Sequence, residues 1–167
     1  EQKKLVSAGR PDIGVHVRVV DDEGNDVEPG EVGEIIVQSK HIMAEYWHRP
    51  EETRETLVDG WLHTGDMGTY DEKGYIYIVD RKRDLIISGG ENIFPQDIER
   101  VLLEHPDIAE VSVVACKDEI YGEEVMAVVV PKPSTDLTEE MVLEFCEGRL
   151  AKFKRPKNVI ISPMLPK

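Results

Sequence analysis

Two hydrophobic patterns divide this chain of 167 residues, and they meet at a run of three consecutive basic residues that follows Asp80. Before the run, valine- and isoleucine-rich stretches alternate with glycine-containing turns, which is typical of β-hairpins. After the run, apolar residues recur at helical spacing between short strand-like stretches. We therefore expect an α+β protein with a β-rich unit at 1–80, a connection at 81–83 and a small mixed α+β domain at 84–167.

The predicted elements follow from turn and cap residues. In the first half, the pattern predicts strands at 16–27 and 30–39, a short helix that begins near Pro50, and a hairpin over 61–80. In the second half, Pro95 opens a predicted helix with Ile98 and Leu102 on one face, and Pro106 ends it. A second helix is expected after Asp136 or Thr138, with Met141, Val142 and Cys146 on its apolar face. Strands at 84–88, 108–116, 124–131 and 158–162 complete a ββαββαβ outline.

The composition argues against several classes of partner. The chain has 34 acidic and 20 basic residues and a net charge of −14, so it repels phosphate backbones and anionic membrane surfaces. It has no apolar stretch long enough to span a bilayer, and its first ten residues lack the apolar segment of a signal peptide. Its two cysteines form no CxxC pair. We expect a cytoplasmic protein with no nucleic-acid partner and no transmembrane segment.

Basic residues nevertheless gather in two places. One cluster is Arg81–Arg83, and the other lies between Arg149 and Lys157. Charge runs are usually solvated faces. The alternative is that two basic clusters in an acidic chain attract a small polyanion such as a nucleotide.

Two short segments contain residues that could bind a ligand. In WLHTGD (61–66), the carboxylate of Asp66 lies on a predicted tight turn, where its two oxygens can accept both hydroxyls of a ribose. The alternative is a turn residue bonded to its own backbone. The pair Gly89–Gly90 is either an ordinary turn or a place where a narrow ligand approaches the backbone closely. It belongs to neither a GxxxxGK[ST] nor a GxGxxG phosphate loop.

Three ordered motifs together resemble the C-terminal portion of AMP-forming acyl-CoA synthetases, members of the adenylate-forming, AMP-binding enzyme superfamily. They are GWLHTGD (60–66), YIVDRKRDLIISGGENIFPQDIE (77–99) and LAKFKRPK (150–157). The resemblance covers the whole chain, and the first 80 residues are similar to the last β-barrel subdomain of the family's large N-terminal domain. It implies ATP-dependent formation of an acyl-AMP and transfer of the acyl group to coenzyme A, with Mg²⁺ held by residues outside this chain. Fatty acids are the first expected substrate and aryl acids the second. A non-catalytic binding module of the same fold is the alternative.

The resemblance also implies roles for single residues. The implied partners are small molecules, namely a carboxylic acid, ATP and coenzyme A. ATP or AMP would be bound by Asp66 and Arg81 at the ribose and by Asn92 near the phosphates. Arg83 would be the hinge about which the small C-terminal domain rotates between two conformations, one for adenylation and one for thiol transfer. Coenzyme A would meet a pantetheine tunnel and a nucleotide-binding segment formed by Ser88, Gly89, Gly90, Phe153, Lys154, Arg155 and Lys157.

The family's adenylation lysine lies in a motif that resembles PKxxSGKxxR. Lys167 matches the first lysine of that motif, so the resemblance places the adenylation lysine just beyond Lys167. We therefore expect no catalytic residue within this chain, and no activity from the chain alone.

Overall fold

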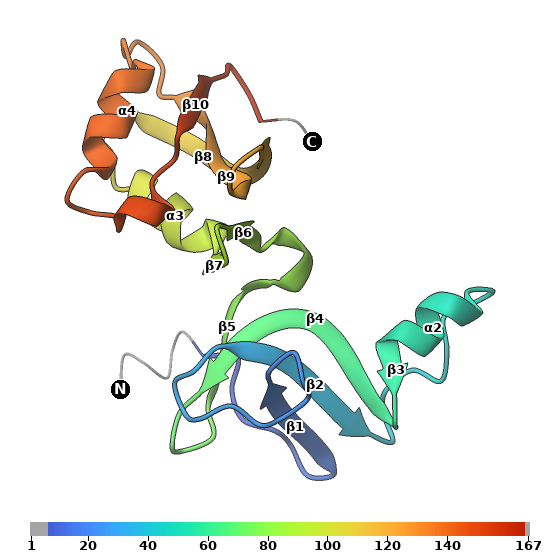
Figure 1. The fold of residues 1–167 in the computed structure, drawn as a ribbon. Helices are drawn as coiled ribbons and strands as arrows, with labels where there is room; N and C mark the ends of the chain where they lie inside the picture. Colours follow the sequence, from blue (N-terminus) through green and yellow to red (C-terminus); the bar gives the residue numbers. More distant parts are fainter. Residues whose placement is uncertain (1–6, 166–167) are drawn as a thin grey trace. The chain divides into compact units, whose positions relative to one another are not determined.

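The fold has two compact units, Glu1–Arg83 and Asp84–Lys167, each built around its own five-stranded sheet (Figure 1). The structure is a computed structural model that describes residues 7–165, so Lys167 lies outside the described residues. The mixture of curled sheets and helices confirms the expected α+β class. Among residues 7–165, no helix is both long and apolar enough to cross a membrane.

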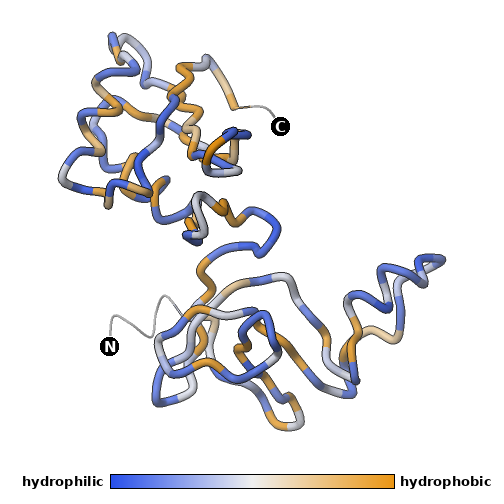
Figure 2. Tube along the Cα trace, in the orientation of Figure 1, coloured by the Kyte–Doolittle hydropathy of each residue, from blue (hydrophilic) through white to orange (hydrophobic). Residues whose placement is uncertain are grey.

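The first unit is a sheet organised around one long, bent strand, β4. Strand β2 pairs with one edge of β4, β3 and β5 pair with its other edge, and β1 adds to β2, all of them antiparallel. Buried Val19, Val20, Ile35 and Ile36 form its core. Helix α2 buries no residue and is hydrophilic along its length (Figure 2). The elements are β1 Val15–Val20, β2 Gly33–Ser39, α2 Pro50–Thr56, β3 Leu57–Val58, β4 Trp61–Tyr70 and β5 Ile76–Arg81.

The first strand is shorter than predicted. Strand β1 ends at Val20 rather than at Val27, because Asp21 begins a tight turn. The Asp21 carboxylate accepts hydrogen bonds from the backbone N–H groups of Glu23 and Asn25, at 2.9 Å each. An Asp side chain that satisfies local backbone donors competes with the β ladder, and this ends the strand.

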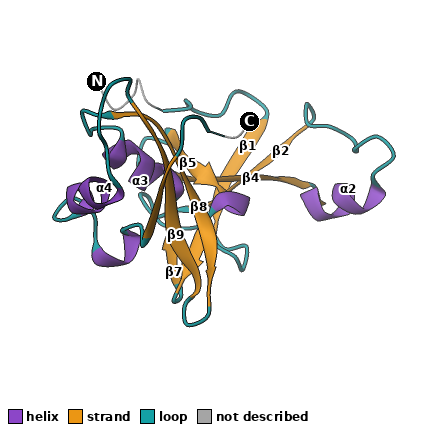
Figure 3. Cartoon of the chain, turned by 90° about the horizontal axis from the view of Figure 1, so that it is seen from above, coloured by secondary structure: helices purple, strands orange, loops and turns teal. Residues whose placement is uncertain are grey.

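The second unit has helices on one face of its sheet. Helix α3 contacts β8 and helix α4 contacts β10, and Figure 3 shows both helices on one side of β8 and β9. The strand order is β10-β9-β6-β7 with β8 also on β9, and among the strands of the described residues 84–165 only β10 pairs in parallel. The elements are β6 Ile86–Ser88, β7 Glu91–Ile93, α3 Pro95–Leu102, β8 Ile108–Asp118, β9 Gly122–Pro131, α4 Glu139–Cys146 and β10 Asn158–Ile161, with short 3₁₀ turns η1 Lys82–Asp84 and η2 Lys152–Lys154.

The caps and apolar faces of both helices largely follow the sequence. Pro95 is in the first turn of α3, and Ile98 and Leu102 are fully buried. Thr138 is the N-cap of α4, since its hydroxyl accepts from the backbone N–H of Met141 at 3.4 Å. Met141 itself is 40% exposed, so its expected place on the apolar face was wrong.

Leu102 and Leu103 offer a matched pair for measuring the second core. Leu102 is fully buried and Leu103 is 52% exposed. Leu102→Ala removes a packed side chain and leaves a cavity, so we expect the free energy of unfolding to fall by about 2–5 kcal/mol. We expect Leu103→Ala to change it by less than about 0.5 kcal/mol. Urea denaturation followed by circular dichroism measures both, and equal losses in the two variants would contradict this packing.

Candidate functional site

The TGD segment is a bulge inside strand β4. Glu34 of β2 pairs with Met67, whereas Ile36 pairs with His63, so two steps along β2 are matched by four along β4. Thr64, Gly65 and Asp66 thus lie opposite Ile35 alone, which is two residues more than a regular ladder has. Gly65 has a φ of 70°, a left-handed conformation that suits glycine. The tight turn expected between two strands is therefore a bulge within one strand, and it redirects the Asp66 side chain.

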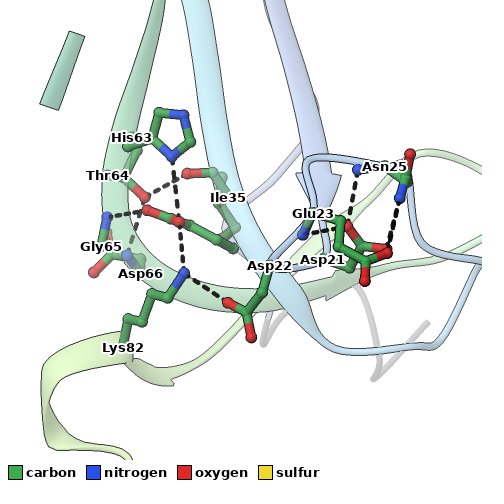
Figure 4. A network of polar contacts seen from close by, with 11 residues as sticks. Asp21, Asp22, Glu23, Asn25, Ile35, His63, Thr64, Gly65, Asp66 and Lys82 are labelled. Atoms are coloured by element: carbon green, nitrogen blue, oxygen red, sulfur yellow. Dashed lines mark hydrogen bonds and ion pairs between the residues drawn. The ribbon is translucent and has the colours of Figure 1, made fainter. Parts of the chain in front are cut away.

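Side chains of β2 and β4 hold this bulge in place (Figure 4). The Thr64 hydroxyl donates to the carbonyl oxygen of Ile35 at 2.6 Å and accepts from the backbone N–H of Asp66 at 3.1 Å. The backbone N–H of Gly65 donates to Oε1 of Glu34 at 3.2 Å. Each bulged residue thus has a hydrogen bond to a fixed partner, which gives Asp66 a defined position.

Asp66 and Arg81 lie opposite each other on β4 and β5. Arg81 Nε contacts Asp66 Oδ1 at 2.7 Å, and the two side chains are 56% and 27% exposed, respectively. The carboxylate thus binds an arginine across the sheet, and the two residues to which the resemblance assigns one ribose lie side by side. An exposed ion pair contributes little to stability, and both groups have further atoms that can bind a ligand.

Glu34 is a buried carboxylate beneath the bulge. Only 8% of the residue is exposed, and its Oε2 lies 3.1 Å from Lys82 Nζ and 3.3 Å from His63 Nδ1. Burial alone would raise the pKa of the Glu34 carboxyl, but hydrogen bonds from His63, Lys82 and Gly65 outweigh it and lower the pKa. Lys82 also contacts Asp22 at 2.9 Å. The sequence analysis missed Glu34, although an acidic residue at the start of an apolar strand is a recognisable signal.

The second unit contains a pocket of about 390 Å³ with basic and aromatic walls. Three cationic side chains and two aromatic rings line it, and the volume lies within the range of small-molecule sites. Its walls come from the β6–β7 turn, the start of β9 and the segment before β10. The lining residues are Ser88, Gly89, Glu91, Tyr121, Val125, Lys152, Phe153, Arg155 and Lys157.

The glycine pair forms the tight turn between β6 and β7. Ser88 pairs with Glu91, and Gly89 and Gly90 between them have φ values of 60° and 88°. Positive φ at both central positions is characteristic of a two-residue hairpin turn and strongly favours glycine. A Cβ atom on Gly89 would lie 3.1 Å from the Tyr121 ring. The turn therefore brings bare backbone close to an aromatic side chain at the pocket wall.

The basic segment 152–157 divides between the pocket and helix α3. Lys152, Arg155 and Lys157 line the pocket, whereas Lys154 Nζ contacts Asp97 Oδ2 of α3 at 2.8 Å. Lys157 Nζ lies 4.5 Å above the Tyr121 ring, and it contacts Glu124 at 3.4 Å and Asp118 at 3.6 Å. Lys154 thus anchors the segment to α3 while its neighbours face the pocket.

Most of the residues expected to bind coenzyme A meet in this pocket. Gly90 and Lys154 are not among the lining residues, while Ser88, Gly89, Phe153, Arg155 and Lys157 are. The pocket is also lined by Glu91, Tyr121, Val125 and Lys152, which the sequence prediction did not name. Lys152 belonged to the basic cluster seen in the sequence, and an aromatic residue next to a glycine in the polar β8–β9 connection could have indicated Tyr121.

Two further candidates belong neither to the Asp66–Arg81 pair nor to the pocket lining. Asn92 is exposed on β7, opposite Ile87, and belongs to the second unit, whereas Asp66 and Arg81 belong to the first. Arg83 is the last residue of the first unit and lies in η1. Within residues 7–165, no group of three or more His, Cys, Asp or Glu side chains is arranged to hold a metal ion.

Comparison with known proteins finds two models of one family. The AMP-binding enzyme model matches residues 1–47, and the AMP-binding enzyme C-terminal domain model matches residues 97–167. Indoleacetate–CoA ligase from Aromatoleum aromaticum is 48% identical over 99% of this chain and 32% of its own length. A long-chain-fatty-acid–CoA ligase from Mycobacterium tuberculosis is 43% identical over 99% of this chain and 32% of its own length. The chain thus spans about a third of the length of these relatives.

Solved structures with the same fold include o-succinylbenzoate CoA synthetase from Bacillus subtilis, bound to its acyl-adenylate intermediate. It superposes with a TM-score of 0.89 and 38% identity over 99% of this chain and 34% of its own. The same synthetase has also been solved with ATP and a magnesium ion.

The lowered pKa of Glu34 predicts how one ion cluster responds to acid. Because folding depresses this pKa below its ordinary value of 4.5, the ionised carboxylate stabilises the fold above that pH, and the contribution disappears as pH falls through the folded-state pKa. We expect Glu34→Gln to lower the free energy of unfolding at pH 7, with a deficit that shrinks as the pH falls below 4.5. Denaturant titrations across this range measure it, with the exposed Asp22→Asn as control. A deficit that is independent of pH would contradict the prediction.

Proposed function

Because this chain belongs to the AMP-binding enzyme family, of which it represents the C-terminal portion, we propose that it forms part of an ATP-dependent carboxylic acid–CoA ligase. The activity is proposed for the full-length protein, since the relatives are about three times as long as this chain. In the proposed reaction, a carboxylate attacks the α-phosphate of ATP, and acyl-AMP and pyrophosphate form. The thiolate of coenzyme A then attacks the acyl carbonyl and releases AMP. Magnesium would be held by residues outside this chain.

The Asp66–Arg81 pair is the observation that carries the proposal. A carboxylate with two acceptor oxygens and a guanidinium with five donors lie 2.7 Å apart and open to solvent. Asp66 can accept hydrogen bonds from both ribose hydroxyls, and Arg81 can donate to a ribose oxygen beside it. The bulge fixes the direction of the carboxylate, so the nucleotide would be positioned without a rearrangement of β4.

The pocket of the second unit would bind the nucleotide end of coenzyme A. Arg155 and Lys157 place positive charge where phosphates would lie, and Lys152 adds a third cation. The rings of Tyr121 and Phe153 supply apolar faces for an adenine. Ser88 and Gly89, which line the same pocket, would contact the pantetheine arm. The pocket supports this assignment through its chemistry, a combination of cations with aromatic walls.

The substrate is proposed only at the level of a carboxylic acid. The two relatives named above act, by their names, on indoleacetate and on long-chain fatty acids, and they are similarly related to this chain. Fatty acids and aryl acids therefore have equal support. A direct comparison of acids in a coupled AMP-release assay with the full-length protein distinguishes them.

Asp66→Asn tests the nucleotide site. The amide keeps the shape of the side chain but loses the charge and one acceptor, so we expect acid-dependent ATP–pyrophosphate exchange to fall by at least about a hundredfold in the full-length protein. Asp26→Asn is the matched control, because Asp26 contacts Arg18 at the same 2.7 Å on the exposed surface. Unchanged exchange in the Asp66 variant would refute the ribose assignment. Complete absence of exchange in the wild-type protein would favour a non-catalytic binding module.

Gly89→Leu tests the coenzyme A wall. A leucine at this position would have to adopt the left-handed φ of 60°, which is unfavourable for any residue with a Cβ, and its side chain would press against Tyr121. We expect thioester formation to slow by at least about tenfold while ATP–pyrophosphate exchange remains near the wild-type rate. Gly148→Leu imposes similar backbone strain, at a φ of 76°, in open space outside the pocket. Equal losses of both half-reactions in the Gly89 variant would count against the assignment.

Arg83→Pro tests the proposed hinge between the units. A hinge residue must change its backbone dihedrals, whereas proline locks φ near −65°, a value that suits a 3₁₀ turn such as η1. We expect one half-reaction to proceed and the other to slow by at least about tenfold. Arg83→Gly removes the same side chain and keeps the backbone free, so both half-reactions should persist. If both half-reactions run normally in the proline variant, the pivot is not at this residue.

A further inference from the structure

We propose that Glu34 is a positioning residue of the nucleotide site. It binds Gly65, which precedes Asp66, and Lys82, which follows Arg81, and so keeps Asp66 and Arg81 opposite each other. This inference rests on the proposed function, because it assigns Asp66 and Arg81 to the nucleotide. Glu34 itself lies beneath the bulge, with 10% of its side chain exposed. It therefore acts through the residues it binds rather than through contact with a ligand.

The two oxygens of Glu34 have separate partners. Oε1 accepts from the backbone N–H of Gly65 at 3.2 Å, and Oε2 contacts Lys82 Nζ at 3.1 Å. Gly65 immediately precedes Asp66, and Lys82 immediately follows Arg81. One carboxylate thus holds the residue next to each member of the ion pair.

Covalent geometry explains why this arrangement orients the pair. Gly65 is held by its backbone N–H within the bulge, and Lys82 is held by its ammonium at the start of η1. Each is joined to Asp66 or Arg81 by one planar peptide unit, so few dihedral angles separate the held residue from its neighbour in the pair. Asp66 and Arg81 are half-exposed and can also pair with water, so their own ion pair is a weak constraint. The contacts of Glu34 are stronger, because its carboxylate is largely buried and a charged hydrogen bond to a buried group is costly to break.

Charge and length are both needed for this role. Glutamine can still accept from Gly65, but it lacks the negative charge that faces Lys82 and His63. Alanine removes every contact. Lys82 has a second partner in Asp22, whose side chain is 87% exposed. Because this contact involves the same ammonium but an exposed carboxylate, an Asp22 variant is the matched control. Lys82→Met removes the link toward Arg81 and leaves the link to Gly65.

The test measures KM for ATP and kcat in acid-dependent ATP–pyrophosphate exchange with the full-length protein. A mispositioned ribose site weakens ground-state and transition-state binding together, so KM should rise more than kcat falls. We expect a rise in KM of about tenfold for Glu34→Ala and a smaller rise for Glu34→Gln and for Lys82→Met. Asp22→Asn should stay within about twofold of wild type. Thermal melting of each variant reports on folding.

A purely structural role predicts a different result. A lower melting temperature with unchanged KM for ATP in Glu34→Gln, or in any folded Glu34→Ala protein, overturns the proposal. An unchanged KM in Lys82→Met overturns the part that concerns Arg81. Asp66→Asn in the same assay separates the two hypotheses. If it has no effect, the proposed function fails, and if it is impaired while the Glu34 variants are normal, only the positioning role fails.

Discussion

The first unit depends on a carboxylate that is buried where a β-strand normally buries an apolar side chain. Glu34 begins an otherwise apolar part of β2, and burial of its charge is costly unless every partner is in place. The bulge of β4 and the lysine after β5 meet that need. Strands β2 and β4 and the start of η1 are thereby joined at one carboxylate, and the partly exposed Asp66–Arg81 pair lies directly beside it. The Asp66–Arg81 pair has a defined geometry because the contacts of the buried Glu34 carboxylate leave the neighbouring backbone few other conformations.

The two candidate sites present their polar groups in different ways. In the first unit, one carboxylate and one guanidinium on paired strands present donors and acceptors side by side. In the second unit, three cations converge on a pocket from a segment that also contains Lys154, whose contact with Asp97 keeps that segment on α3. Nearby acidic groups such as Glu124 moderate the charge of Lys157. A net charge of −14 therefore coexists with a local surface suited to phosphate.

Local sequence signals correctly predicted where both helices of the second unit begin. Pro95 and Thr138 mark helix starts because the missing N–H and the capping hydroxyl act within one turn. The bulge at Thr64–Asp66 was not predictable in this way, since it depends on the pairing of β4 with a distant strand. The partners of Glu34 and the inward turn of Lys154 likewise depend on tertiary contacts. Motif spacing could suggest which residues bind a ligand, but it could not show that Lys154 faces α3 while Tyr121 faces the pocket.

The parallel pairing of β10 with β9 has a consequence for how the second site assembles. Parallel neighbours need a long crossover, here the stretch that contains α4 and η2, and the pocket-lining bases lie at its end. The backbone N–H of Lys157 donates to the carbonyl oxygen of Val125 at 3.0 Å, at the start of this pairing. The pocket therefore closes only when the last strand docks, after a large loop entropy has been lost. Binding in this pocket and completion of the fold would thus be linked, so that a ligand bound there would also hold the segment before β10 in place.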